Sequence, residues 1–206
     1  ALLTAAVESG IPGAATELAR QQLAGSFPGR GVEGVMTMLL EAARTGDVSA
    51  ARYLLQLYRD GNGVVLQPDR EAAETTLASF EALLGPENVA VERILMRAND
   101  GSSAANLQTI SDEFSKLSRG NGVQILKRLR SSNAHAYVFI VQQRLQERGI
   151  YTGPVHGTLD SRTIGALRIA CEQVGATRIC DAGPLTAGAV EVIGNYLFDP
   201  AMSAGT

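Results

Sequence analysis

The sequence predicts an all-α protein, for three reasons. Alanine, leucine and glycine dominate the composition, whereas the chain has no Trp and only five Tyr and five Phe, and aromatic residues are among those that strands favour. Apolar residues recur at helical spacing, as they do across the segment 33–46. Glycine, alone or beside proline, follows most of these segments, as it does at many helix ends.

Length, charge and hydropathy exclude two classes of protein. The 206 residues can fill one large or two small cores, but the net charge of -3 leaves no positive field of the kind that supplies most nucleic-acid affinity. We therefore expect no nucleic-acid partner. No apolar run reaches the roughly 18 to 20 residues that cross a bilayer, and no signal-peptide pattern opens the chain. Because the chain begins at Ala1, we expect a mature or trimmed fragment, and a membrane tether upstream is left open.

The N-terminal part of the chain contains five expected helical segments. Ser49 is expected to cap the fourth helix. Asp69 opens the fifth, which Gly85 and Pro86 close. The segments are 1–13, in which Gly10 and Pro12 break a short helix, and 14–23, 33–46, 49–58 and 68–84.

A repeated phrase runs through the same region. Residues 46–64 align with residues 101–123, since both begin with Gly before a Ser-Ala-Ala run and both end in GNGV; residues 10–32 are a looser copy. Helix pairs repeated in this way expose apolar faces that only the neighbouring pair can cover. The repeat therefore predicts an α-solenoid of helix-turn-helix units over residues 1–132.

The middle of this region shows a pattern of small residues, then Tyr-x-x-Gly-x-Gly-Val, then Asp and Ala-Ala, carried by Ala50, Ala51, Leu54, Tyr58, Gly61, Gly63, Val64, Asp69, Ala72 and Ala73. This pattern resembles the Sel-one-like subfamily of tetratricopeptide-type repeats. The resemblance implies a scaffold that binds protein partners and has no catalytic residues of its own.

Residues 133–206 predict a small domain of three helices. A helix ending at Gly149 leads into a turn-rich loop, and a second helix begins at Asp160. A third helix follows Gly183 and Pro184. The apolar stripes expected to face the core are Val138, Val141, Leu145 and Ile150 in the first helix, Ile164, Leu167 and Ile169 in the second, and Ala189, Val190, Ile193 and Leu197 in the third.

Apolar, glycine and threonine positions recur through this segment at fixed spacing, namely Val141, Leu145, Gly149, Tyr151, Gly153, Gly157, Leu159, Thr163 and Leu167. This motif resembles that of the three-helix peptidoglycan-binding domain of bacterial cell-wall proteins. In this sequence His156 and Asp160 replace that family's usual Asp and Gly. The resemblance implies a wall-binding role.

The loop between the first two of these helices is the best candidate for a binding site. It offers an aromatic plane, hydroxyl groups, backbone amides and an imidazole, which suit a sugar or a short peptide. The candidate residues are Tyr151, Thr152, Gly153, His156, Gly157, Thr158 and Asp160. In the alternative interpretation Tyr151 and Leu159 fill the core and the glycines serve the turn. No nucleophile or carboxylate pair accompanies His156 as a catalytic base, so we expect no enzyme.

The two cysteines, Cys171 and Cys180, are nine residues apart, a spacing that a disulfide can close across a helix end and a loop. Two buried thiols are the alternative. With His135 and His156 they form no metal-ligand spacing, so neither a metal nor a cofactor is expected.

Repeats followed by a wall-binding domain resemble the periplasmic part of alphaproteobacterial polar organelle development proteins. This resemblance implies a periplasmic scaffold, linked to cell polarity, that couples a protein partner to peptidoglycan. The alternative is a pure protein-interaction module, in which residues 133–206 have lost glycan binding and only cap the solenoid.

Overall fold

The computed structural model describes residues 2–25, 31–63 and 65–199. All regular structure in these ranges is helical, so the all-α prediction is confirmed. The chain divides into two compact units, Ala1–Glu92 and Arg93–Thr206. None of the helices within the described ranges is both long and apolar enough to cross a membrane.

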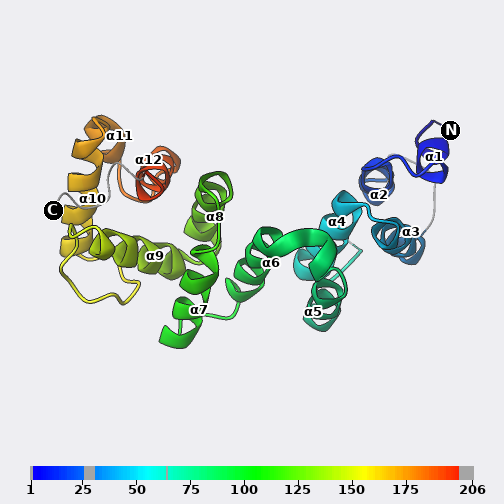
Figure 1. Ribbon diagram of the computed structural model, residues 1–206, viewed down its shortest axis with the longest axis horizontal. Coiled ribbons are helices and arrows are strands. Elements are labelled where there is room, and N and C mark those ends of the chain that lie inside the picture. Colours follow the sequence, from blue (N-terminus) through cyan, green and yellow to red (C-terminus); the bar gives the residue numbers. More distant parts are fainter. Residues whose placement is uncertain (1, 26–30, 64, 200–206) are drawn as a thin grey trace. The chain divides into compact units, whose positions relative to one another are not determined.

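In the first unit each of the first four helices packs against the next along the chain, and α4 also contacts α2 (Figure 1). Gly85 (φ +75°) breaks the regular geometry of the sixth helix, and the division between the two units falls within that helix. The helices are α1 (Leu2–Glu8), α2 (Ala14–Leu23), α3 (Val32–Arg44), α4 (Val48–Asp60), α5 (Arg70–Ser79) and α6 (Glu81–Arg97).

The helix predicted over 14–23 is confirmed, whereas two expected boundaries are wrong. The N-cap of α4 is Asp47, not Ser49: one carboxylate oxygen of Asp47 accepts the Ser49 and Ala50 amides. The other accepts the Gly13 amide at 2.8 Å, so one side chain ties α4 to the start of α2. The helix predicted over 68–84 ends at Ser79, because α6 starts as a separate element directly after Phe80.

A buried ion pair lies inside the first unit. The Arg59 guanidinium contacts the Glu92 carboxylate, and both side chains are almost fully enclosed; it also binds Asp60 at 2.7 Å. Burial alone would lower the pKa of Arg59, but the hydrogen bonds and charges of Asp60 and Glu92 outweigh that effect and raise it. Arg59 therefore stays charged and links the end of α4 to α6.

The second unit contains the remaining helices, which pack as a single cluster. Helix α9 contacts α7 and α8, while α12 contacts α8, α9, α10 and α11. The unit thus begins before residue 133, because α7 and α8 cover faces of α9 and α12. The predicted extents of the repeat region (1–132) and of the peptidoglycan-binding-like domain (133–206) stay predictions. The helices are α7 (Ala104–Phe114), α8 (Arg119–Ser132), α9 (Ala134–Glu147), α10 (Ser161–Gln173), α11 (Thr177–Cys180) and α12 (Ala187–Leu197).

The Gly-Asn-Gly parts of the two GNGV phrases have different structures; Val64, which ends the first phrase, lies outside the described residues. Gly61 (φ +68°) ends α4, as expected, but Gly120–Val123 lies in the first turns of α8. Gly122 there serves a close approach: a Cβ at this position would overlap the Phe198 ring. The sequence likeness of residues 46–64 and 101–123 therefore does not extend to a shared helix end.

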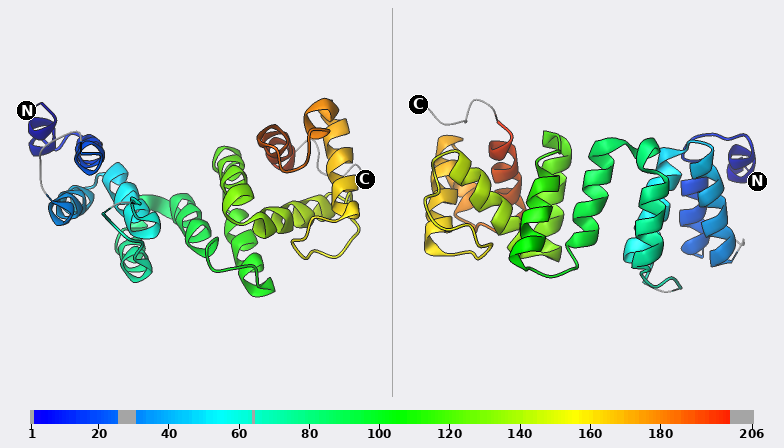
Figure 2. Two further views of the ribbon diagram at one scale, coloured as in Figure 1. Left: turned by 180° about the vertical axis from the view of Figure 1, so that it is seen from behind. Right: turned by 60° about the horizontal axis from the view of Figure 1, so that its bottom comes forward.

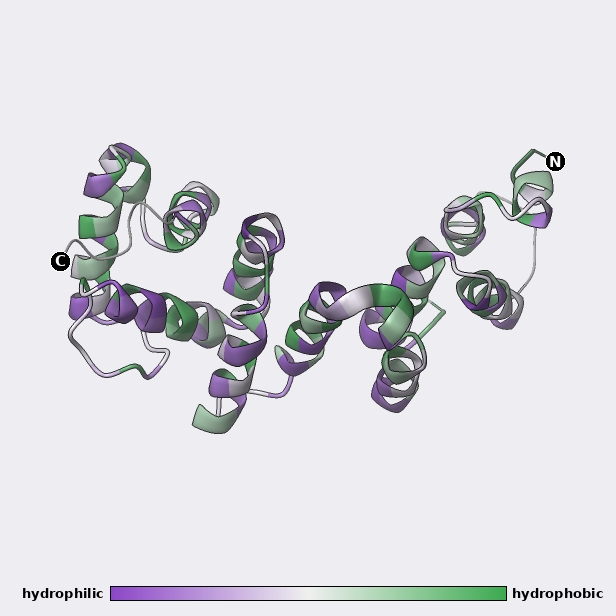
Figure 3. Ribbon diagram, viewed as in Figure 1, coloured by the Kyte–Doolittle hydropathy of each residue, from purple (hydrophilic) through white to green (hydrophobic). Residues whose placement is uncertain are grey.

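The predicted apolar stripe holds for α12 and, for its three residues within the helix, for α9; Ile150 lies beyond the end of α9 and is half-buried. In α10 only Leu167 of the three predicted residues is buried. Figure 3 shows the hydrophobic first half of α9 and its hydrophilic second half. In α10, Ile164 and Ile169 are 40% and 44% exposed, so they do not face the core. The buried face of α10 instead follows the helical repeat of Thr163, Ala166, Leu167, Ala170 and Cys171.

The predicted disulfide between Cys171 and Cys180 is present, with a Cα–Cα distance of 6.4 Å. It joins the end of α10 to α11. Reduction is expected to lower the free energy of unfolding of the second unit by about 2–3 kcal/mol, because the short loop gains freedom in the unfolded chain. Urea unfolding with and without reductant measures this difference. Intact mass after alkylation without reductant checks the bond, since thiol uptake would contradict it.

Candidate functional site

The candidate loop, residues 151–160, joins α9 to α10 and is the yellow segment between them in Figures 1 and 2. Both its ends are fixed by capping. The amides of Ile150 and Tyr151 donate to the carbonyl of Leu145 at 2.9 and 3.1 Å. At the other end, where the second helix is predicted to begin, Asp160 caps α10 and accepts the Thr163 amide at 2.7 Å.

A fully buried glutamine, Gln142 of α9, holds the middle of the loop. Its carbonyl oxygen accepts the amides of His156 and Gly157 at 3.0 and 2.9 Å. Its amide nitrogen donates to the Thr158 carbonyl at 3.0 Å and to the Thr163 hydroxyl at 2.8 Å. All four interactions are made inside the protein, so the loop and the start of α10 are positioned by one side chain.

Tyr151 supports the loop from within. Its ring is 2% exposed, and its hydroxyl donates to the Pro154 carbonyl at 2.8 Å. Gly153 lies against this ring, because a Cβ there would come within 2.6 Å of the Tyr151 hydroxyl. The aromatic plane predicted as a stacking surface is therefore enclosed, in agreement with the alternative that places Tyr151 in the core. Leu159 is only half-buried.

Gly157 is the tightest point of the loop. It has a φ of +74°, and a Cβ would lie 2.8 Å from the carbonyl oxygen of His135. The His135 ring nitrogen Nδ1 lies 3.0 Å from the Gly157 carbonyl. Gly157 is buried, so it contributes shape to the loop rather than a contact surface.

The predicted residues that reach solvent are Thr152, His156, Thr158 and, partly, Asp160. The Thr158 amide donates to Nδ1 of His156 at 3.0 Å, so the neutral ring carries its proton on Nε2. That nitrogen lies 3.6 Å from Asp160 Oδ2. The exposed surface of the loop therefore includes an imidazole N–H beside a carboxylate, with Thr158 next to the imidazole.

The Asp160 carboxylate is held in its charged form. Hydrogen bonds from the Thr163 hydroxyl and amide lower its pKa below the usual 3.8, and the nearby charges of His156 and Arg162 act in the same direction. The cap therefore stabilises the start of α10 at neutral pH. This stabilisation is lost only as the pH falls below 3.8 and through the lowered pKa.

The structure brings His156, Thr158 and Asp160 together and turns Tyr151, Gly153 and Gly157 inward. The residue that the sequence analysis missed is Gln142. A signal for it exists, because this polar side chain directly follows Val141 on the buried side of α9. Across the described ranges, no group of three or more His, Cys, Asp or Glu side chains could hold a metal ion.

Comparisons with protein-family models, with curated protein sequences and with solved structures found no match for this chain.

Proposed function

We propose that the protein is a non-enzymatic scaffold of the bacterial periplasm. In this proposal the N-terminal helices form an α-solenoid that binds a protein partner, and residues 133–206 form a three-helix domain that associates with peptidoglycan. The observation that carries the proposal is the loop 151–160, held rigid by Gln142 with its polar groups at the surface. Preorganised donors and acceptors of this kind suit a neutral, hydroxyl-rich ligand.

Two further features support the location and the architecture. A disulfide persists in oxidising compartments such as the bacterial periplasm. In the first unit, the helices from α1 to α5 each pack beside the next one in sequence, as the helices of repeat proteins do. A membrane tether upstream of Ala1 is part of the same proposal. The arguments from the disulfide and from the helix packing hold with or without it.

The second candidate function is a pure protein-interaction module without glycan binding. The enclosed ring of Tyr151 favours it, because sugar ligands commonly stack on exposed aromatic faces and this loop presents none. Under this alternative the loop would only shape the start of α10.

Retention on purified peptidoglycan sacculi separates the two functions. We expect His156→Ala to reduce the retained fraction of the full chain by about tenfold, because the variant removes an exposed donor while the Gln142 hydrogen bonds that hold the loop remain. Gln124→Ala, an exposed polar residue of α8, is the control. Wild-type protein that is not retained, or equal retention of the two variants, would favour the pure interaction module.

A further inference from the structure

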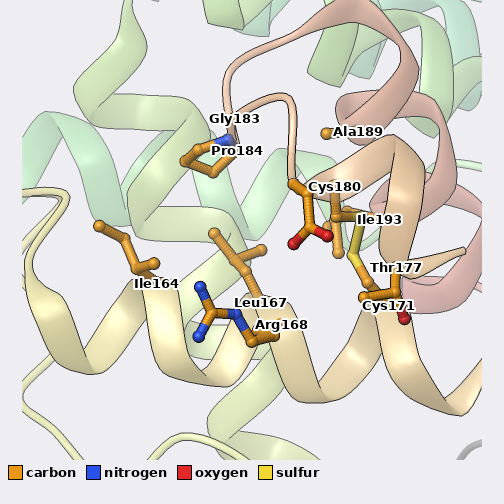
Figure 4. A pocket seen from close by; sticks show the side chains of 11 residues that line it. Ile164, Leu167, Arg168, Cys171, Thr177, Cys180, Gly183, Pro184, Ala189 and Ile193 are labelled. Carbon is orange, nitrogen blue, oxygen red and sulfur yellow. A yellow bond between two sulfur atoms is a disulfide. The ribbon is translucent and has the colours of Figure 1, made fainter.

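A second candidate site lies in the same unit, away from the loop. A cavity of about 140 Å³ is bounded by α10, α11, the segment 181–184 and α12. Its inner wall is apolar, because Leu167 of α10 and Ile193 of α12 line it and are both almost fully buried. Figure 4 shows Ile164 and Leu167 on α10, with Pro184 across from them. The interior therefore accepts a small apolar group.

The walls of this cavity are held in place. Cys171 and Cys180 both line it, and their disulfide links α10 to α11 (Figure 4). The Tyr137 hydroxyl donates to the Pro184 carbonyl at 3.2 Å, which fixes the segment before α12 to α9. A cavity that is already formed in this way costs little ordering when a ligand enters.

Two side chains of opposite charge line the same cavity. Arg168 and Asp181 are both exposed, so they lie where the cavity meets solvent. Among the residues that the structure describes, neither side chain has a hydrogen-bond or ion-pair partner. Thr177 is the remaining polar side chain of the lining, so the lining carries one formal charge of each sign.

The disulfide brings these two charges to the same part of the cavity. Asp181 directly follows Cys180, and Arg168 precedes Cys171 by three residues, which places it one turn away on the same side of α10. The Cα atoms of the two cysteines are 6.4 Å apart. A ligand that enters the cavity beside the disulfide therefore meets both charges.

This combination favours a ligand with an apolar group and two opposite charges close together. A ligand with one charge would leave either Arg168 or Asp181 without a counterpart, and a neutral peptide segment would offer a counterpart to neither. Hydrogen bonds between two charged groups are also stronger than those to neutral amides. An α-amino acid carries a carboxylate and an ammonium group on the same carbon atom as its side chain, so it matches all three features of the cavity.

We propose that this cavity binds a free aliphatic α-amino acid. The side chain enters the space between Leu167 and Ile193, the carboxylate accepts from the Arg168 guanidinium, and the ammonium group donates to the Asp181 carboxylate. The volume agrees, since a cavity of roughly 150 Å³ lined by apolar residues holds benzene, which is larger than the isobutyl group of leucine.

The test is an NMR titration of the full chain with leucine, followed through the methyl signals of Leu167 and Ile193. We expect saturable shifts with a Kd on the order of 1 mM for so small a ligand. N-acetyl-leucine N-methylamide replaces both charges by amides, and glycine lacks the side chain; each is expected to bind at least about tenfold more weakly. Shifts that do not saturate with leucine, or equal or tighter binding of either comparison ligand, would overturn the proposal.

Two singly charged analogues of leucine assign the charges. Isocaproate lacks the ammonium group, and isoamylamine lacks the carboxylate. Arg168→Gln is expected to weaken the binding of leucine and isocaproate about fivefold but not that of isoamylamine. Asp181→Asn is expected to weaken the binding of leucine and isoamylamine but not that of isocaproate. A variant that weakens both analogues equally, or neither, contradicts the assignment of these two side chains.

Arg178→Gln and Glu172→Gln are the matched controls. Arg178 is exposed on α11 and Glu172 on α10, and neither lines the cavity. We expect both controls to bind leucine as the wild type does, and circular dichroism checks that all four variants fold. Equal weakening by a control and its partner variant would show that net charge, rather than the cavity, governs binding, and would count against the proposal.

The amino-acid site is independent of glycan binding. Sacculus retention reports on His156, and the leucine titration reports on Arg168 and Asp181. Either result can therefore fail without the other.

Discussion

Replacement of Gln142 by leucine is expected to lower the free energy of unfolding of the second unit by about 3–5 kcal/mol. Leucine is close to glutamine in size, so the change removes hydrogen bonds more than it removes volume. The amides of His156 and Gly157 and the carbonyl of Thr158 would each lose their partner in a buried or partly buried setting. Each such loss costs about 1–3 kcal/mol.

Gln146→Leu is the matched control for this change. Gln146 also lies on α9 and donates to the same loop, at 3.1 Å to the Gly153 carbonyl, but its side chain is exposed. Water replaces the lost bond there, so a cost below about 1 kcal/mol is expected. Urea unfolding followed by circular dichroism measures both variants, and hydrogen exchange of α9 and α10 amides assigns the loss to this unit. Similar costs for the two glutamines would show that Gln142 does not organise the loop.

Local signals in the sequence predicted most of the helices and the start of a helix at Asp160. Helix 14–23 and the stripe of α12 depend on spacing along one segment, and such patterns are readable without the rest of the chain. The cap at Asp47 was missed because the sequence offers Ser49 two residues later as an equally good cap. What decides between them is the Gly13 amide, which is distant in sequence and close only in the fold.

The inward face of α10 shows the same limit. Ile164 and Ile169 are the more hydrophobic choices, yet Thr163 is the buried residue. Its hydroxyl donates to Asp160 and accepts from Gln142. These two hydrogen bonds offset the cost of burying a polar group at this position. The sequence alone does not show that Asp160 and Gln142 both hydrogen-bond to Thr163. The same displacement leaves Ile164 free to line the cavity beside the disulfide.

Gly157→Ala is expected to lower the free energy of unfolding of the second unit by about 2–4 kcal/mol. A left-handed φ of +74° costs an L-residue about 1–2 kcal/mol. The added Cβ would also lie 2.8 Å from the His135 carbonyl oxygen and 3.1 Å from a Leu107 methyl. The His135 carbonyl belongs to the backbone of α9, which cannot shift easily, so the loop has to move instead.

Gly175→Ala separates the two contributions, because Gly175 has nearly the same backbone conformation, φ +67°, with nothing within 4 Å of an added Cβ. Only the conformational cost applies there, about 1 kcal/mol after the gain from a stiffer unfolded chain. The sequence offers both positions as turn glycines and cannot rank them. A difference of about 1–3 kcal/mol, from urea unfolding of the two variants, would therefore measure how tightly the loop is pressed onto α9. An equal loss of unfolding free energy in the two variants would mean that His135 and Leu107 shift to accept the added Cβ, and that the loop can be displaced without losing its fold.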